Sequence, residues 1–432
     1  MRRSLVLTLL IGAWCPAAWA QTATAPGFIE ARGFLFPQDA PNDPTRAVSD
    51  WLWRQEGILR PTPSLQLVAG VDLRANTHDQ IEDVWRIDWE DRHLRPPRMS
   101  VRRLAATVAV GRLTLDVGKQ FIRWARADVL NPIDRFAPRD FTNVIDTEFL
   151  PVVGARSSLQ LGPETVELVF VPRFTPSRMP LLTQRWTIVP PHMASVSILD
   201  AGSRFPEKPQ FGGRWRHTGS RLEGGLSYFD GYNHLPVLDV RGGQPIFEAR
   251  EEEVLDLPVP RQPVIIGRTP LVLTRIYPRI RTYGLDFAVP MPWLTVKGEA
   301  AYFLSRDDAF PEYGLYVLEI ERQMGEWLFT GGYAGEVVTG EDRPLAFDPE
   351  RSLARSFIAR AFYTAGPQRT FTLEAVGRQN GEGFYVMGEY SHGFGEFWRI
   401  TITQVVLAGD EDDFLGQYRR NSQLSAALRL SF

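Results

Sequence analysis

The sequence predicts an all-β protein, a single transmembrane antiparallel β-barrel of about 18 strands by the alternation rule. Three observations predict this fold. Large apolar residues alternate with polar residues along many stretches, and the connections between these stretches alternate between short and long. The chain also ends inside such a stretch, at Phe432. We expect the short turns at the periplasmic rim and the long loops at the extracellular rim.

The first 20 residues have the pattern of a secretory signal peptide. A positive start, Met1-Arg2-Arg3, precedes an apolar run and the small-residue site Ala18-Trp19-Ala20. The predicted barrel domain is therefore 21–432. Because the single cysteine, Cys15, falls in the signal peptide, the exported chain offers no disulfide and no thiolate metal site.

Alternation of apolar and polar side chains locates the expected strands in chain order. The first two are expected over 28–36 and 64–74, and because they have the weakest patterns, 16 strands is the main alternative. The clearest later alternations are Trp85–Glu90, Leu113–Val117, Leu294–Ala300, Phe371–Ala375, Trp398–Thr403 and Leu424–Phe432.

The connections fall into two classes of length. Seven are short, at 111–112, 162–164, 218–220, 290–292, 324–326, 366–368 and 393–395. Six long ones are expected at about 37–63, 123–153, 174–208, 232–276, 339–353 and 409–417, with shorter ones at 93–98 and 380–382. An even strand count then places both termini at the rim with short turns.

Aromatic residues near strand ends suggest girdles at the two membrane interfaces. An alternative is that aromatic residues are simply common in strands. The residues concerned are Trp85, Trp89, Tyr228, Tyr302, Trp327, Tyr333, Tyr363, Tyr390 and Trp398.

The segment from Gly118 to Phe141 abandons alternation for a mixture of charged and aromatic residues, broken by Asn131-Pro132 and Ala137-Pro138. Five basic and five acidic residues lie between Lys119 and Glu148, which favours a compact loop whose charges pair with one another.

The run G-K-Q-F-I-R-W-A-R-A-D-x-x-N-P-I-D in this segment resembles a motif of Gram-negative outer-membrane porin-like barrels, nearest to the alginate-export-like barrels and their uncharacterised relatives. Lys119 stands where that motif usually has Arg, and Ala125 where it has Gly. The resemblance covers about 40 residues and the general architecture. It implies that the loop of about 119–148 folds inward and narrows a pore. The residues that would line this constriction are Arg123, Arg126, Asp128, Asp134, Arg135, Arg139 and Asp140. Alternatively, these residues only fasten a loop to the barrel rim.

Charged residues in the inward phase of the strands are expected to line the lumen. The predicted set is Asp88, Glu90, Asp116, Lys297, Glu299, Arg378 and Arg399. Acidic and basic residues are nearly balanced over all strands, so no strong ion selectivity follows. Any one of them can instead brace the barrel through ion pairs.

No catalytic or metal-binding motif appears among the six histidines, and we expect no catalysis, no cofactor and no metal. The acidic stretch Asp410–Asp413 is better explained as a solvated loop tip than as a cation site. A net charge of −3 argues against nucleic-acid binding.

The resemblance and the fold together imply an outer-membrane channel for passive diffusion of small hydrophilic solutes. The alternatives are a barrel that only anchors surface-binding loops and a soluble secreted β-sandwich. Expected partners are outer-membrane lipid and lipopolysaccharide and the small solutes, and the sequence leaves the oligomeric state open between a monomer and a homotrimer. The closing strand, with Leu428 and Leu430 in the row of Phe432, resembles the C-terminal signal read by the barrel-assembly machinery.

Overall fold

A computed structural model describes residues 22–127, 130–188, 198–242, 245–248, 264–268, 270–308, 310–341 and 347–432. The predicted signal peptide lies outside these residues, as does Asp128 of the predicted constriction. Among the described residues, no helix is long and apolar enough to cross a membrane.

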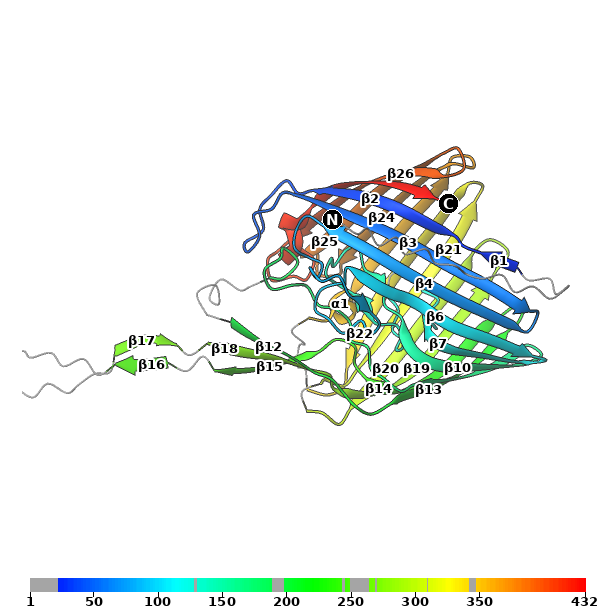
Figure 1. The fold of residues 1–432 in the computed structure, drawn as a ribbon, viewed down its shortest axis with the longest axis horizontal. Coiled ribbons are helices and arrows are strands. Elements are labelled where there is room, and N and C mark those ends of the chain that lie inside the picture. The colour runs from blue at the N-terminus through cyan, green and yellow to red at the C-terminus, as the bar shows by residue number, and fades with distance from the viewer. Residues whose placement is uncertain are drawn as a thin grey trace, which may run out of the picture.

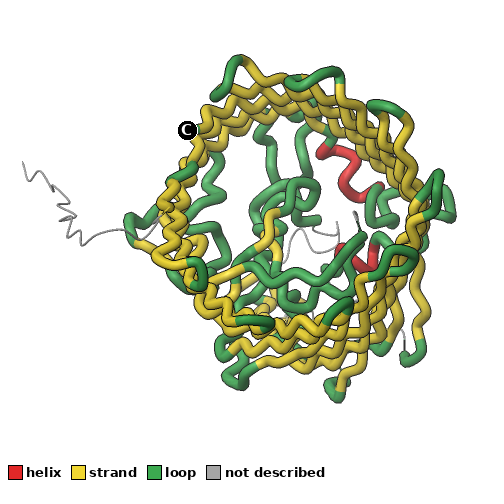
Figure 2. Tube along the Cα trace, turned by 90° about the vertical axis from the view of Figure 1, so that its right-hand side faces the viewer, coloured by secondary structure: helices red, strands yellow, loops and turns green. Residues whose placement is uncertain are grey.

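Eighteen antiparallel strands form a closed barrel (Figures 1 and 2), which confirms the predicted fold class and excludes the 16-strand alternative. The barrel closes where the first of these strands pairs with the last, from Phe28 opposite Ser431 to Leu35 opposite Leu424. The strands are β2 (Gly27–Leu35), β3 (Ala47–Thr62), β4 (Leu65–Asn76), β6 (Met99–Val110), β7 (Leu113–Gln120), β10 (Val152–Leu161), β11 (Glu164–Val171), β13 (Gln210–Thr218), β14 (Glu223–Tyr232), β19 (Arg279–Pro290), β20 (Thr295–Ser305), β21 (Tyr313–Met324), β22 (Trp327–Val338), β23 (Ser356–Thr364), β24 (Arg369–Arg378), β25 (Gly383–Phe394), β26 (Trp398–Gly409) and β27 (Gln423–Ser431).

The alternation in sequence becomes an apolar outer face and a polar inner face. In β7, Leu113, Leu115 and Val117 are exposed on the outside, whereas Asp116 is buried inside. In β27, Leu424 and Leu428 are exposed on the outside. A barrel with this arrangement is suited to lipid outside and water inside.

One predicted strand is wrong, and one strand was missed. Residues 85–90 were expected as a strand, but they lie in the 77–98 connection, where only β5 (Ile87–Asp88) pairs with β6, in parallel. Their alternation is local: Asp91 turns the chain with a φ of 53°, and the Asp88 carboxylate accepts a hydrogen bond from its backbone N–H.

The missed strand is the 16-residue β3, which lies inside the stretch 37–63 that was expected as a loop. Its outward Trp51 and Trp53 alternate with the inward Leu52 and Arg54, and a tight turn at 63–64 leads directly into β4. The two errors offset each other, so the predicted count of strands is correct although its membership is not.

The seven short turns that were expected all connect barrel strands at one rim. The first described residues and the C-terminus lie there too: Gly27 and Phe432 exchange two backbone hydrogen bonds of 2.9 Å, and β1 (Thr22–Thr24) pairs with the end of β3. At the other rim, β12 (Ile198–Arg204), β15 (Val237–Gly242) and β18 (Leu271–Ile276) form a small sheet. This sheet and the hairpin of β16 (Pro245–Glu248) and β17 (Val264–Arg268) project beyond the barrel (Figure 1).

Aromatic rings gather on the outer face in chains that cross neighbouring strands. Near the short turns, the Trp327 and Tyr363 rings lie 4.5 Å apart, and the Phe371 and Tyr390 rings lie 4.8 Å apart. Such chains are suited to an interfacial girdle. Trp85 and Trp89, which were predicted to belong to a girdle, lie in the 77–98 connection and not on a strand.

Loops from the long-loop rim fill much of the lumen (Figure 2). They include 121–150, with β8 (Arg139–Asp140) and β9 (Glu148–Phe149), and two short helices, α1 (Pro349–Ser352) and η2 (Gly416–Asn421). Buried apolar side chains of these loops pack against the inner wall. One such cluster includes Trp124, Ile133 and Phe136 with Phe229 and Phe303 of the strands.

Candidate functional site: a charged cavity inside the barrel

The connection between β7 and β10 is a compact structure inside the barrel. Asp134 fixes its first turn: one carboxylate oxygen accepts hydrogen bonds from the backbone N–H of Trp124 at 2.5 Å and of Ala125 at 2.8 Å. The other oxygen accepts from Arg123 Nε at 3.2 Å. Asp134 is 5 % exposed, so this bonding offsets the cost of burying its charge.

An aromatic anchor holds the same loop against the wall. The Phe136 ring meets the rings of Trp124 and Phe229 edge to face, at 5.3 and 4.9 Å. Gly212 of β13 makes room, since a Cβ there would lie 2.8 Å from the Phe136 ring. The sequence predicted that this loop folds inward, but its partners in the wall, Gly212 and Phe229, lie 76 and 93 residues from Phe136 in the chain.

The tip of the loop, 141–147, is bounded by the two-residue strands β8 and β9, which pair with each other. Arg178 locks its base, donating to Asp140 Oδ2 at 2.8 Å and to Asp91 Oδ1 at 3.0 Å. Burial works against the charge of Arg178, but the two carboxylates outweigh it and raise the pKa of the guanidinium.

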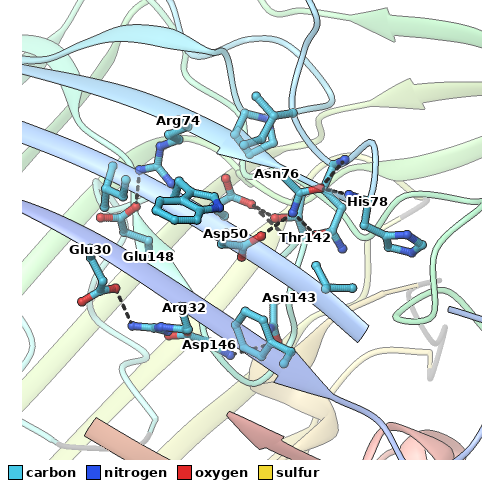
Figure 3. A pocket seen from close by; sticks show the side chains of 18 of the residues that line it. Glu30, Arg32, Asp50, Arg74, Asn76, His78, Thr142, Asn143, Asp146 and Glu148 are labelled. Carbon is cyan, nitrogen blue, oxygen red and sulfur yellow. Dashed lines mark hydrogen bonds and ion pairs between the residues drawn. The ribbon is translucent and has the colours of Figure 1, made fainter. Parts of the chain in front are cut away.

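A cavity of about 270 Å³ lies between this loop and the wall formed by β2, β3 and β4 (Figure 3). Polar residues of the loop tip, among them Thr142, Asn143 and Thr147, face it. Its charged lining residues are Arg32, Arg54, Arg74, Arg185, Arg429, Glu30, Asp50, Asp140, Asp146 and Glu148.

Glu148 joins the loop to three strands of the wall. Its Oε1 accepts from Arg54 of β3 at 2.6 Å and from Arg102 of β6 at 2.7 Å, while its Oε2 accepts from Arg74 of β4 at 2.6 Å. Burial alone would raise the pKa of the carboxyl, but the three guanidinium groups outweigh it and hold that pKa well below its usual range. Glu148 is therefore ionised at neutral pH and fastens the loop to the wall.

A second set of ion pairs runs along the same wall. Asp146 of the loop pairs with Arg32 of β2. Arg32 also contacts Glu30 at 3.0 Å, and Glu30 contacts Arg429 of β27 at 2.6 Å. Four of the five lining arginines stand on strands, where Glu30 and Asp50 accompany them, and the other three carboxylates stand on the loop that faces them. The strands therefore carry an excess of positive charge and the loop an excess of negative charge. This arrangement creates a field across the cavity even though positive and negative residues are equal in number.

The opposite side of the loop tip faces a second, largely apolar cavity of about 200 Å³. Val144 and Ile145 of the tip line it together with Val376 of β24 and Tyr385 of β25. The tip therefore separates a charged space from an apolar one.

Of the residues predicted for the constriction, Asp140 lines the charged cavity and Arg139 lines the apolar one. Arg126 pairs with Glu223 at 2.5 Å and with Asp286 at 2.7 Å, and so ties the loop to β14 and β19. Arg135 is buried against Glu350 at 2.7 Å.

Arg123 and Asp134 are the remaining described residues of the predicted constriction. They bond to each other at the loop entrance, where Arg123 also lies over the Phe149 ring at 3.9 Å. For Arg123, Arg126, Asp134 and Arg135 the observed contacts match the alternative of fastening the loop.

The residues predicted to line the lumen divide by element. Asp116, Lys297, Glu299, Arg378 and Arg399 lie on barrel strands, whereas Asp88 and Glu90 lie in the 77–98 connection. Most of the seven have close partners: Asp116 pairs with Arg156 at 2.8 Å, Lys297 with Glu321 at 2.5 Å, and Arg378 with Asp413 at 2.9 Å. Glu299 accepts from the Ala127 backbone N–H at 2.6 Å, Glu90 pairs with Arg173 at 2.7 Å, and Arg399 donates to Ser391 Oγ at 3.0 Å.

Sequence reasoning missed the wall arginines Arg54, Arg74 and Arg102 as parts of a site. Arg54 was missed together with β3. A usable signal was present for it, since Asp50, Leu52 and Arg54 share the inward phase opposite the two tryptophans. Nothing in the sequence shows that Glu148 would reach all three, because they lie 46 to 94 residues earlier in the chain and meet it only when the loop folds inward.

Within the described ranges, no group of three or more His, Cys, Asp or Glu residues is arranged to hold a metal ion. The cavity offers guanidinium, carboxylate and amide groups, which bind and orient polar solutes.

Solved structures share this architecture over nearly the whole chain. OccAB4 of Acinetobacter baumannii has a TM-score of 0.54 at 11 % identity, covering 96 % of this chain and 98 % of that one. A BenF-like porin from Pseudomonas fluorescens Pf-5 has the same TM-score and coverage at 9 % identity. The fold is that of a porin. OpdQ of Pseudomonas aeruginosa follows with a TM-score of 0.52 at 11 % identity, covering 94 % of this chain and 98 % of that one.

At these identities the likeness concerns the fold alone. It supports a porin-like barrel and not the alginate-export-like barrels as nearest relatives. No protein-family model matches the chain, and no curated protein matches it.

Proposed function

We propose that this protein is a passive outer-membrane channel for small hydrophilic solutes, narrowed by the loop 121–150. The observation that carries the proposal is the charged cavity of about 270 Å³ between that loop and the wall of β2, β3 and β4. A solute in this cavity meets an excess of guanidinium groups on the strand side and carboxylates on the loop side. This lining suits polar and charged solutes and disfavours apolar ones.

The balance of charge argues for weak ion selectivity. Five arginines and five carboxylates line the cavity, and the ion pairs described above partly neutralise them. Solutes are then sorted by size and by their fit to the transverse field. The porins with the same fold support the channel reading, and no feature of the site calls for catalysis or a cofactor.

The apolar outer face supports placement in the outer membrane. We further propose that residues 1–20 direct export and are removed, and that lipopolysaccharide contacts the rim with long loops. We also propose that Phe432, which follows β27 and is 51 % exposed, is recognised by the barrel-assembly machinery. A homotrimer stays a prediction, as does the likeness of the Gly118–Asp134 run to alginate-export-like barrels.

Planar-bilayer recording of the purified protein tests the proposal. We expect steady single-channel openings whose conductance increases with salt concentration, together with heat-modifiable migration in gel electrophoresis. Heat-modifiable migration without openings would contradict the channel while leaving the barrel intact.

A second candidate function is a barrel that anchors a binding surface. The projecting sheet of β12, β15 and β18, with the hairpin beyond it, favours this reading (Figure 1). Deleting the hairpin distinguishes the channel from the surface anchor. A channel should keep its single-channel openings without the hairpin. A surface anchor should lose its binding function and should show no openings with or without the hairpin.

A further inference from the structure

The outer face of the barrel is hollowed across β21 to β24. A row of register partners forms the floor: Ile320 of β21, Gly331 of β22, Ala359 of β23 and Ala375 of β24. A Cβ added to Gly331 would meet no atom within 4 Å, so the space outside it is open. Larger side chains surround the floor, including Leu318, Phe329, Tyr333 and Leu373, and the hollow measures about 770 Å³.

A positively charged side chain, that of Arg322, lies at the edge of this hollow. Arg322 belongs to the outward row of β21 that also carries Leu318, Ile320 and Met324, and its side chain is exposed. It lies close to the short-turn rim, since β21 ends at Met324. An arginine on an outward row is costly in hydrocarbon and tolerated near the headgroups.

No acid neutralises Arg322 within the described parts of the chain. The adjacent Glu321 points the other way and pairs with Lys297 at 2.5 Å. The neighbour of Arg322 is instead an aromatic ring: its guanidinium carbon lies 5.9 Å from the ring of Trp293, which is 62 % exposed in the turn before β20. A tryptophan in this position belongs at the level of lipid headgroups.

We propose that this hollow is a binding site for an anionic phospholipid of the inner leaflet of the outer membrane. The phosphate pairs with Arg322, the headgroup lies beside Trp293, and an acyl chain fills the space over Gly331, Ala359 and Ala375. Charge complementarity selects this occupant, because an apolar groove alone would accept any acyl chain. The site rests on the proposed placement in the outer membrane but not on conduction.

Native mass spectrometry of the purified, detergent-solubilised protein tests the site, with dioleoyl phosphatidylglycerol as probe and dioleoyl phosphatidylcholine as the neutral comparison. We expect the wild type to retain phosphatidylglycerol preferentially. Arg322→Gln should reduce its retention about fivefold, from the attraction of one arginine to an anionic lipid, and Arg322→Lys should largely keep it. Gly331→Leu, which fills the hollow, should reduce the retention of both lipids.

Arg112→Gln is the matched control, because Arg112 is exposed in the short turn between β6 and β7 and does not line the hollow. It should leave lipid retention unchanged. Heat-modifiable migration identical to wild type shows that each variant folds. Equal phosphatidylglycerol retention by wild type and Arg322→Gln would overturn the proposal. The proposal would also be overturned if the wild type formed oligomers and Gly331→Leu abolished them, because a second copy of the chain would then occupy the hollow. Absence of bilayer openings would contradict the channel but not this site.

Discussion

Glu148 shows how one carboxylate can set the shape of a lumen. It contacts arginines from β3, β4 and β6, so a single loop residue braces three strands that are consecutive around the barrel. Asp72 of β4 shares these arginines, and contacts Arg54 at 2.7 Å and Arg74 at 2.9 Å. Removing Glu148 therefore leaves three positive groups with one carboxylate between them.

We predict that Glu148→Gln makes the channel more permeable to anions. The cavity loses one negative charge, and the ratio of anion to cation permeability should increase roughly twofold. The measurement is the reversal potential under a salt gradient. Glu396→Gln, in the exposed turn between β25 and β26, is the control and should leave the potential unaltered. An unchanged reversal potential in Glu148→Gln would contradict the assigned position of this carboxylate.

The pH dependence of this site follows from the lowered pKa of Glu148. The folded pKa lies below that of a free glutamate, about 4.3. The anchoring is therefore complete above that value and is lost only as pH falls through the lower folded pKa. Between pH 7 and pH 5 the difference in reversal potential between wild type and Glu148→Gln should stay constant. If that difference has vanished by pH 5, the carboxylate is not held by the three arginines.

A second buried group, His234, is held in its neutral form by burial. Its ring is buried between the carbonyls of Thr175 and Arg135, at 2.6 and 2.8 Å, and burial lowers the pKa of His234 to about 4. An unfolded histidine has a pKa of about 6.5, so the unfolded chain binds more protons between these values. The free energy of unfolding should therefore decrease as pH falls from about 6.5 to about 4.

Thermal midpoints measured across this range test the role of His234. His234→Gln should flatten the pH dependence. His217→Gln, at a half-buried histidine that pairs with Glu164, should leave most of it. A wild-type midpoint that does not change from pH 7 to pH 4.5 would refute the buried, neutral histidine.

Among the elements, the strands were predictable and the loop interior was not. Alternation located most strands because one face meets an apolar surrounding and the other a polar lumen. It failed at 85–90, where alternation continues into a loop, and at β3, whose start was hidden among charged residues. Periodicity reports two-faced exposure and does not report which partner a segment pairs with.

At the same scale, the loop 121–150 depends on its aromatic anchor. Phe136 is 2 % exposed and packs on Trp124 and Phe229. We predict that Phe136→Ala destabilises the loop by about 3–5 kcal/mol, the usual cost of emptying a buried phenylalanine site. Limited proteolysis within 121–150 should then become faster and the open-channel current noisier. Phe371→Ala, on the outer face, is the control. Unchanged proteolysis of Phe136→Ala would show that the loop is held by its ion pairs alone.

For the whole molecule, the sequence predicted a closed barrel with an inward loop but did not show which charges of that loop meet the wall. The resemblance directed attention to Arg123, Arg126 and Arg135, and the observed contacts of these residues fasten the loop. The charged cavity instead joins Glu148 and Asp146 to arginines of β2, β3 and β4. These partners become neighbours because the loop folds back inside the barrel over strands that precede it by 74 to 114 residues, a contact that no local pattern reports.

Blocking the charged cavity tests the central claim most directly. The only cysteine, Cys15, lies in the predicted signal peptide, so Asn143→Cys is expected to place a single thiol on the loop side of the cavity in the exported chain (Figure 3). Modification by a charged, water-soluble methanethiosulfonate during bilayer recording should reduce the single-channel current stepwise, by roughly half or more for a group of this size in a narrow pore. Asn380→Cys, in the exposed turn between β24 and β25, should show no step. An unaltered current through an Asn143→Cys channel whose introduced thiol is shown by mass to be fully labelled would contradict a solute path through this cavity.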